Sequence, residues 1–326
     1  MTSFNRRALL GVAAAALLAG PALAQQKTVS VYSAHNTAII NALQPKFEQE
    51  TGIKIELVKA GSGDIIRRVR AEAGAPKADV IWSIGGEALE ANKDLLAAYA
   101  PKDAAALDPA FKASPEWLPY TGIMSVFAVN TKKLKPEEYP KSWKDLADPK
   151  WKGKISSARA DASGSSFMQL ANVLIAYGDK GWEMYNAILA NMVMSDSSGA
   201  VPRFVNDGEA LVGLTLEDNA LEYVRGGGNV AIVYPADGTA AIADGIALVK
   251  GAPNEANAKV FLDWLLSKDV QAFVVEKIGR RPVRTDVPAT GLKPMGEIKL
   301  VKYDIPTVAA KRKEWLDAWK KAFQNR

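Results

Sequence analysis

Hydrophobic and polar positions follow two different periods near the start of the chain. Residues 28–32 are rich in β-branched and aromatic side chains, and residues 53–57 alternate apolar and charged side chains as a half-buried strand does. Between these two runs, the apolar side chains of residues 39–47 recur at helical spacing. Asn36 or Thr37 can cap the start of that helix. The pattern predicts a strand, a helix and a second strand.

The same alternation continues further along the chain. A turn at residues 61–64 leads into a second helical pattern, and residues 79–82 form a third apolar run. Strands that alternate with helices imply a parallel sheet with right-handed crossovers, in which ligands bind beyond the carboxyl ends of the strands. We therefore expect residues 33–37, 61–64 and 83–87 to share one rim.

The middle of the chain predicts a second α/β unit. Residues 122–129 and 244–250 are nearly continuous apolar runs of the buried-strand type, and alternating strands and helices lie between them. We expect one lobe from residues 25–125 and 245–326, which includes the C-terminal helices, and a second lobe from residues 126–244. Two lobes joined by two long strands predict hinge closure on a ligand.

The first residues have the order of an export signal. Arg6 and Arg7 precede an apolar, alanine-rich run over residues 8–20, and Ala22 and Ala24 offer the small residues that a signal peptidase requires. We expect residues 1–24 to be a cleaved signal peptide and the mature protein to work in the periplasm. The arginine pair leaves both the general and the twin-arginine export routes open.

Composition excludes several classes of function. The chain has no cysteine, so neither disulfides nor thiol chemistry are expected. Lysine and arginine are spread along the chain without a dense run, which argues against nucleic acid as a partner. One histidine and no His-Glu-x-x-His motif leave little material for an enzyme, and no cofactor is expected. The remaining enzymatic alternative is a carboxylate-based hydrolase that uses a pair such as Glu217 and Asp237.

Short motifs follow one another in a characteristic order. They are Val31–His35, Gly61–Asp64, Ala78–Trp82, Ser142–Leu146, Asp148–Ile155, Ala162–Ser166, Gly213–Ala220, Tyr234–Thr239 and Asp244–Ala247. This succession resembles the solute-binding proteins of bacterial ABC importers, a group that includes ferric-ion-binding proteins and relatives for phosphorylated sugars and phosphonates. The resemblance implies a type II periplasmic-binding-protein fold, which is α/β with two lobes and an interlobe cleft. It also implies a monomer that delivers a small molecule to a membrane permease and its ATPase.

A serine-rich segment is the strongest candidate for the ligand site. Ser163, Ser165 and Ser166 precede the apolar positions of a helix, so free N–H groups and hydroxyls at the helix start can converge on a phosphate or carboxylate. The residues alone equally allow one serine to cap the helix while the others are solvated. In the resembling family this loop borders the cleft.

The opposing rim and the second lobe offer further polar groups. Hydroxyls and backbone groups near the first and second strands can close on the same anion, and carboxylates can receive an ammonium or sugar hydroxyls at the other end. Helix capping and ordinary turns are open alternatives for most of these residues. The full candidate set is Ser33, His35, Asn36, Thr37, Ser62, Gly63, Ser163, Ser165, Ser166, Thr215, Glu217, Asp218 and Asp237.

Ferric ion is the alternative ligand. Ferric relatives often ligate the metal with an adjacent tyrosine pair, but this chain has residues 216–219, Leu-Glu-Asp-Asn, where the resemblance would place that pair. A metal site could instead use His35 with Glu217, Asp218 and Asp237. Because the tyrosine pair is missing, we expect an anionic solute, either a sugar phosphate or an aminoalkyl phosphonate.

Overall fold

A computed structural model describes residues 27–111 and 114–326 of the protein. The predicted signal peptide lies outside these residues. Within them, no helix combines the length and the hydropathy needed to cross a membrane.

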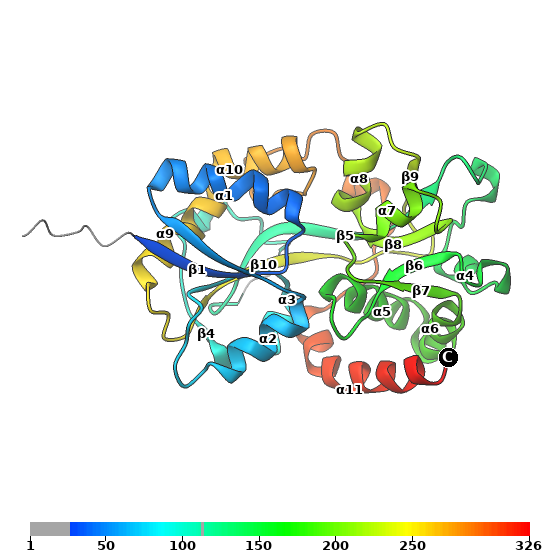
Figure 1. Ribbon diagram of the computed structural model, residues 1–326, viewed down its shortest axis with the longest axis horizontal. Helices are drawn as coiled ribbons and strands as arrows, with labels where there is room; N and C mark the ends of the chain where they lie inside the picture. Colours follow the sequence, from blue (N-terminus) through cyan, green and yellow to red (C-terminus); the bar gives the residue numbers. More distant parts are fainter. Residues whose placement is uncertain (1–26, 112–113) are drawn as a thin grey trace, which may run out of the picture.

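The structure is built from strands and helices that alternate along most of the chain (Figure 1). The strands are β1 (Thr28–Ser33), β2 (Lys54–Lys59), β3 (Val80–Gly85), β4 (Leu96–Ala97), β5 (Leu118–Asn130), β6 (Ile155–Ala158), β7 (Met192–Ser195), β8 (Val212–Leu216), β9 (Val230–Val233) and β10 (Ala241–Val249). The helices are α1 (Thr37–Thr51), α2 (Ser62–Ala71), α3 (Gly86–Glu90), α4 (Trp143–Leu146), α5 (Gly164–Tyr177), α6 (Gly181–Ala190), α7 (Val201–Asn206), α8 (Glu217–Arg225), α9 (Glu255–Leu266), α10 (Lys268–Phe273) and α11 (Ile305–Gln324).

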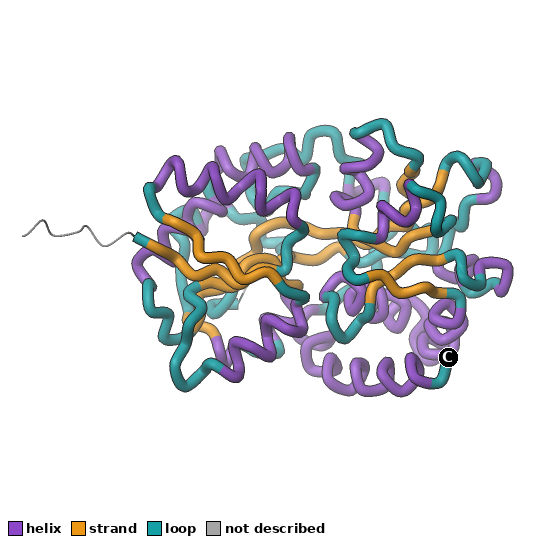
Figure 2. Tube along the Cα trace, in the orientation of Figure 1, coloured by secondary structure: helices purple, strands orange, loops and turns teal. Residues whose placement is uncertain are grey.

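The strands run through the middle of both lobes, and the helices cover them (Figure 2). Neighbouring strands follow the order β2-β1-β3-β10-β5-β8-β6-β7, with β4 beside β10 and β9 beside β5. Strands β1, β2 and β3 are parallel, as the alternation of periods predicts, whereas β10 is antiparallel to both β3 and β5. The parallel β1, β2 and β3 direct their carboxyl ends, and the connections that follow them, toward the second lobe.

Strand β5 joins the two lobes. Its first part, Leu118–Met124, pairs with β10, and its second part, Ser125–Val129, pairs with β8. A single continuous strand therefore belongs to the sheets of both lobes, and every residue of it is buried. The change of partner lies one residue before the predicted boundary at residues 125 and 126; the full division of residues between lobes stays a prediction.

Local sequence signals explain where the first helix begins and ends. The side chain of Asn36 accepts a hydrogen bond from the backbone N–H of Ile39 at 2.9 Å, which caps α1. Gly52 ends the helix with φ of 69°, in the left-handed region that glycine enters without a steric penalty. The helix buries the stripe that its period predicts, including Leu43 and Phe47, against β1 and α9.

The C-terminal helix departs from the expected lobe. Helices α9 and α10 pack in the first lobe, but Trp315 and Trp319 of α11 lie in the core of the second lobe with Phe167 and Tyr185. Figure 1 shows α11 beneath α5 and α6. Only the start of the helix reaches the first lobe, where Ile305 packs against α3 and the side chain of Trp117. An apolar stripe shows that a helix is docked, but it does not show against which lobe.

Candidate functional site

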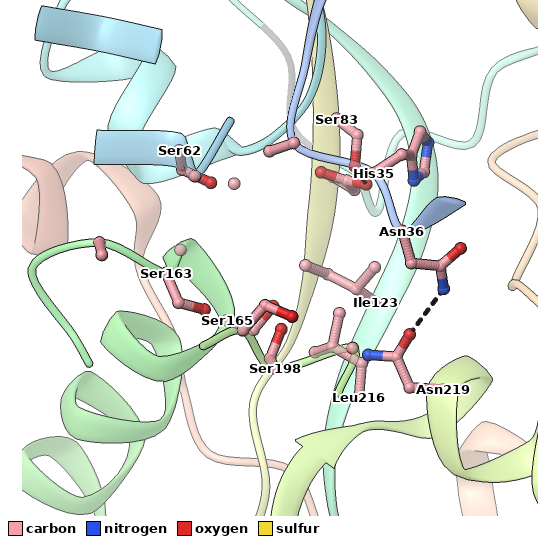
Figure 3. A pocket seen from close by; sticks show the side chains of 18 of the residues that line it. His35, Asn36, Ser62, Ser83, Ile123, Ser163, Ser165, Ser198, Leu216 and Asn219 are labelled. Carbon is pink, nitrogen blue, oxygen red and sulfur yellow. Dashed lines mark hydrogen bonds between the residues drawn. The ribbon is translucent and has the colours of Figure 1, made fainter. Parts of the chain in front are cut away.

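A cavity of about 510 Å³ lies between the two lobes, where the connections after β1, β2 and β3 approach the second lobe. The first lobe contributes residues 34–37, 59–62, 64, 83 and 85 to its lining. The second lobe contributes residues 162–165 at the start of α5 and residues 196–200 before α7. Figure 3 shows Ser62 and Ser83 on one side of this cavity and Ser163, Ser165 and Ser198 on the other.

Three helices of ten residues or more begin at the cavity. They are α1, capped by Asn36, α2, which starts at Ser62, and α5, capped by Ser163. The Ser163 hydroxyl accepts a hydrogen bond from the backbone N–H of Ser166 at 3.4 Å. The N–H groups of Gly164 and Ser165 have no acceptor among the described residues. The positive ends of three helix dipoles and free N–H donors therefore point toward one space.

Gly164 allows the starts of α2 and α5 to approach each other. A Cβ atom at this position would lie 2.8 Å from the hydroxyl oxygen of Ser62, which is closer than two such atoms can come. The backbone N–H of Gly63 also donates to the carbonyl of Ala162 at 3.3 Å. A larger residue at position 164 would displace the side chain of Ser62 from its place in the cavity lining.

A second contact joins the lobes at another point of the cavity. The amide nitrogen of Asn36 donates to Oδ1 of Asn219 at 2.9 Å (Figure 3). The amide nitrogen of Asn219 donates to the hydroxyl of Thr215 at 3.2 Å, and that hydroxyl donates to the carbonyl of Ser198 at 2.8 Å. Thr215 is fully buried and acts through this chain, because it does not itself line the cavity.

An ion-pair network forms the floor of the cavity. Arg280 donates from Nε to Asp218 at 2.8 Å and from Nη1 to both Thr121 and Asp244. The Ser83 hydroxyl donates to the same carboxylate oxygen of Asp244 at 2.6 Å. Burial would lower the pKa of Arg280, but the carboxylates of Asp218 and Asp244 outweigh it and raise that pKa. Burial raises the pKa of Asp244 against the opposing effect of Arg280.

The position of Arg280 depends on an unusual turn. A π-helical turn over Val274–Ile278 ends at Gly279, whose φ is 81°. A Cβ atom at Gly279 would lie 2.5 Å from Leu221, so only glycine fits the conformation and the space. Sequence reasoning missed Arg280, because no pattern around it signals a site.

His35 is one of the residues that line the cavity, but its ring packs into the first lobe. The ring makes edge-to-face contacts with Trp82 and Tyr120, at centroid distances of 4.7 and 5.5 Å. Both ring nitrogens are buried and have no hydrogen-bond partner among the described residues. Burial, aided by the positive charge of Arg280, lowers the pKa of His35 well below its usual value.

The other predicted carboxylates lie outside the cavity lining. Glu217 accepts two hydrogen bonds from Arg281, each at 2.8 Å, and one from Tyr234 at 2.5 Å. Asp218 is engaged by Arg280, and Asp237 accepts a hydrogen bond from the hydroxyl of Tyr177. These carboxylates are held by partners that are distant in sequence and that their own motifs did not reveal.

The predicted small residues divide between the cavity and the structure around it. Those that line the cavity are Asn36, Thr37, Ser62, Ser163 and Ser165. Ser33 and Ser166 are buried behind the lining, and Gly63 packs against the backbone of Asp161. Asn219, Ser83 and Asp244 line the cavity but were not among the predicted ligand residues. Ser83 lies on the predicted rim, whereas Asn219 and Asp244 belong to two of the family motifs, and no local pattern favoured any of the three over neighbouring polar residues.

The described residues do not assemble the alternative metal site. No group of three or more His, Asp or Glu side chains within residues 27–111 and 114–326 lies close enough to share a metal ion. Glu217 and Asp218 point to two different arginines, and Asp237 bonds to Tyr177. The four residues proposed from the sequence are therefore not brought together.

Residues 42–299 match the family of bacterial extracellular solute-binding proteins. The chain belongs to this family. A putative 2-aminoethylphosphonate-binding periplasmic protein of Salmonella paratyphi A is 33% identical to this solute-binding protein over 249 residues, 74% of this chain and 73% of the relative. The periplasmic binding protein AfuA from Actinobacillus pleuropneumoniae, with fructose-6-phosphate bound, has a similar structure, with a TM-score of 0.86 at 27% identity over 92% of this chain and 99% of AfuA.

Iron-bound HitA from Pseudomonas aeruginosa shares the fold with a TM-score of 0.79, at 25% identity, over 91% of this chain and 99% of HitA. These similarities confirm the predicted two-lobe α/β fold of the solute-binding protein. They also confirm the predicted role as a non-enzymatic solute-binding component of an ABC importer.

Replacing His35 with phenylalanine should make the stability of the solute-binding protein less dependent on pH. The folded protein keeps His35 neutral, whereas the unfolded chain protonates it below about pH 6.5. The unfolded state then binds more protons, so wild-type stability falls with falling pH, by about 1.4 kcal/mol in total between pH 7.5 and pH 5.5. The His35→Phe variant lacks this loss. Urea unfolding of both proteins between about pH 5.5 and pH 7.5 measures this difference. If the free energy of unfolding depended on pH equally in the two proteins, the result would contradict the buried, neutral state of His35.

Replacing Asn219 with alanine should shift the lobes of the solute-binding protein apart. The variant loses the 2.9 Å hydrogen bond across the cleft but leaves the cap of α1 intact. Because the chain has no cysteine, spin labels at introduced cysteines replacing exposed Arg67 and Glu183 report the interlobe distance. We expect Asn219→Ala to reduce the short-distance population.

Asn36→Ser is the matched second variant, because serine keeps a capping oxygen but loses the amide donor. The two changes break one bond, so the double variant should resemble either single variant. Additive shifts would show that Asn36 and Asn219 do not act as a pair.

Proposed function

We propose that this solute-binding protein captures a small phosphorylated or phosphonate solute between its lobes. On this proposal the protein works in the periplasm and delivers the solute to the permease and ATPase of an ABC importer.

The convergence of helix starts carries the proposal. A phosphoryl group has three oxygens that each accept hydrogen bonds, and it is stabilised by the positive ends of helix dipoles. The cavity offers the starts of α1, α2 and α5 together with the hydroxyls of Thr37, Ser62, Ser163 and Ser165. Uncharged donors from both lobes suit an anion that has to be released again at the membrane.

The charged side chains that line the cavity leave the helix starts as its source of positive potential. Lys59 and Asp196 are both exposed on the cavity lining and form no ion pair within the described part of the chain, so their opposite charges offset each other. The charge of Arg280 is already matched by Asp218 and Asp244. The anionic group is therefore expected near α2 and α5 rather than on the floor.

The relatives include both chemistries that the sequence suggested. The Salmonella relative is named for 2-aminoethylphosphonate, and AfuA was solved with fructose-6-phosphate. HitA was solved with iron. No tyrosine belongs to the cavity lining among the described residues, and no cluster of three metal-binding side chains occurs there. Anionic oxygen donors of the kind that ferric ion prefers are thus not gathered, which favours the phosphorus-containing solutes.

Removing the hydroxyls of Ser163 and Ser165 together should weaken binding of such solutes tenfold or more. Hydrogen bonds to charged groups contribute about 1.5–3 kcal/mol each, and 1.4 kcal/mol corresponds to a factor of ten in affinity. Titration calorimetry with fructose 6-phosphate, 2-aminoethylphosphonate and inorganic phosphate measures the change.

Ser142→Ala is the matched control, because Ser142 caps α4 and does not line the cavity. It should lower stability slightly and leave affinity unchanged. Ferric citrate is the competing ligand in the same titrations. Tight ferric binding with a visible absorption band, and no heat from any phosphorus compound, would overturn the proposal.

A further inference from the structure

The floor of the cavity has a donor and an acceptor that the protein itself leaves unused. Asp244 is 3% exposed and lines the cavity; its Oδ2 is engaged by Ser83 and Arg280, but its Oδ1 has no partner among the described residues. Arg280 is 5% exposed and also lines the cavity. Its Nε and Nη1 are engaged, while Nη2 has no partner in the same part of the structure. A buried donor or acceptor that stays unmet costs about 1–3 kcal/mol, so both atoms require a partner in the bound state.

The adjacent opposite charges restrict which partner fits. A ligand ammonium placed on Asp244 would lie beside the guanidinium of Arg280, which bonds to the same carboxylate. A ligand phosphoryl group placed on Arg280 would lie beside the carboxylates of Asp244 and Asp218. With two carboxylates against one guanidinium, the floor repels a phosphoryl group, and an ammonium, which can only donate, leaves Nη2 of Arg280 without an acceptor. A hydroxyl group carries no charge, and it both donates and accepts.

The Ser83 backbone holds this floor in place. Ser83 is the one described non-glycine residue with a positive φ, at 69°, which is an uncommon conformation for a residue with a side chain. Its hydroxyl donates to Asp244 at 2.6 Å and so fixes the orientation of the carboxylate. Strained backbone of this kind is concentrated at ligand-binding positions.

Apolar side chains of the hinge strands complete the lining. Ile123 of β5, Leu216 of β8 and Ile242 of β10 all line the cavity. A ligand that reaches from the helix starts to the floor has to cover them. A hexose-sized ring offers C–H groups for these contacts and hydroxyls for the floor, whereas a two-carbon chain would leave much of the 510 Å³ cavity to water.

We infer that the solute is a phosphorylated polyol, whose hydroxyls bind the floor formed by Asp244, Arg280 and Ser83. This inference rests on the proposed function, because it assumes that the anionic group lies at the helix starts. It distinguishes the hydroxylated class from the aminoalkyl phosphonates, since a hydroxyl can both donate to Asp244 and accept from Arg280, whereas an ammonium can only donate.

Titration calorimetry of the wild-type protein with a matched series of ligands tests the inference. Methylphosphonate carries only the anionic group, 2-hydroxyethylphosphonate adds a hydroxyl, and 2-aminoethylphosphonate adds an ammonium of similar size. Glucose 6-phosphate and fructose 6-phosphate add the full set of hydroxyls. We expect 2-hydroxyethylphosphonate to bind at least tenfold more tightly than 2-aminoethylphosphonate. At least one hexose phosphate should bind at least a hundredfold more tightly than methylphosphonate.

Equal or tighter binding of the amine overturns the inference but leaves the proposed function intact. Absence of binding by every phosphorus compound overturns both. Ser83→Gly supplies a variant test, because glycine accepts the positive φ and removes only the hydroxyl. It should weaken hexose phosphate binding about tenfold and leave methylphosphonate binding unchanged. An equal loss for both ligands, with an unchanged melting temperature, would show that Ser83 does not act through the polyol end and would contradict the assignment of the floor.

Discussion

Two consecutive arginines meet two consecutive acids in the interior of this protein, and the arrangement of the cleft depends on them. Arg280 pairs with Asp218, and Arg281 pairs with Glu217, with all four side chains about 95% buried. An isolated buried charge costs several kcal/mol, so each partner requires the other. The acids begin α8 of the second lobe, while the arginines follow α10 of the first lobe.

The same residues are tied to the strands that join the lobes. The carbonyl of Arg281 accepts a hydrogen bond from the N–H of Gly122 in β5 at 2.8 Å, and Arg280 bonds to Asp244 of β10. The network thus fixes the start of α8 relative to both connecting strands. Because two carboxylates, Asp218 and Asp244, surround the one guanidinium of Arg280, the floor has no spare positive charge. The available positive potential then comes from the helix starts at the opposite side of the cavity.

Much of the fold could be predicted from the sequence, because its signals are local. The periods of residues 28–57 and the cap at Asn36 produce β1, α1 and β2 nearly at their predicted bounds. The placement of α11 could not be predicted in this way. Its buried tryptophans fit either lobe, and only the packing against Phe167 and Tyr185 decides between them.

The candidate site likewise contains residues that a local sequence signal predicts and residues that no local signal predicts. Serines at helix starts carry a local signal, and Ser62, Ser163 and Ser165 do line the cavity. Carboxylates have no such signal, because their role depends on which partner the fold brings to them. Glu217 and Asp218 are taken by Arg281 and Arg280, more than sixty residues away in the chain.

A crystal structure of the protein with glucose 6-phosphate or fructose 6-phosphate would test the central claim most directly. The account predicts the phosphoryl group against the N–H groups of Gly164 and Ser165 and the hydroxyls of Ser163 and Ser165 at the start of α5. It predicts sugar hydroxyls on Oδ1 of Asp244 and Nη2 of Arg280. A phosphoryl group bound to Arg280 on the floor, with the sugar directed toward α5, would contradict it.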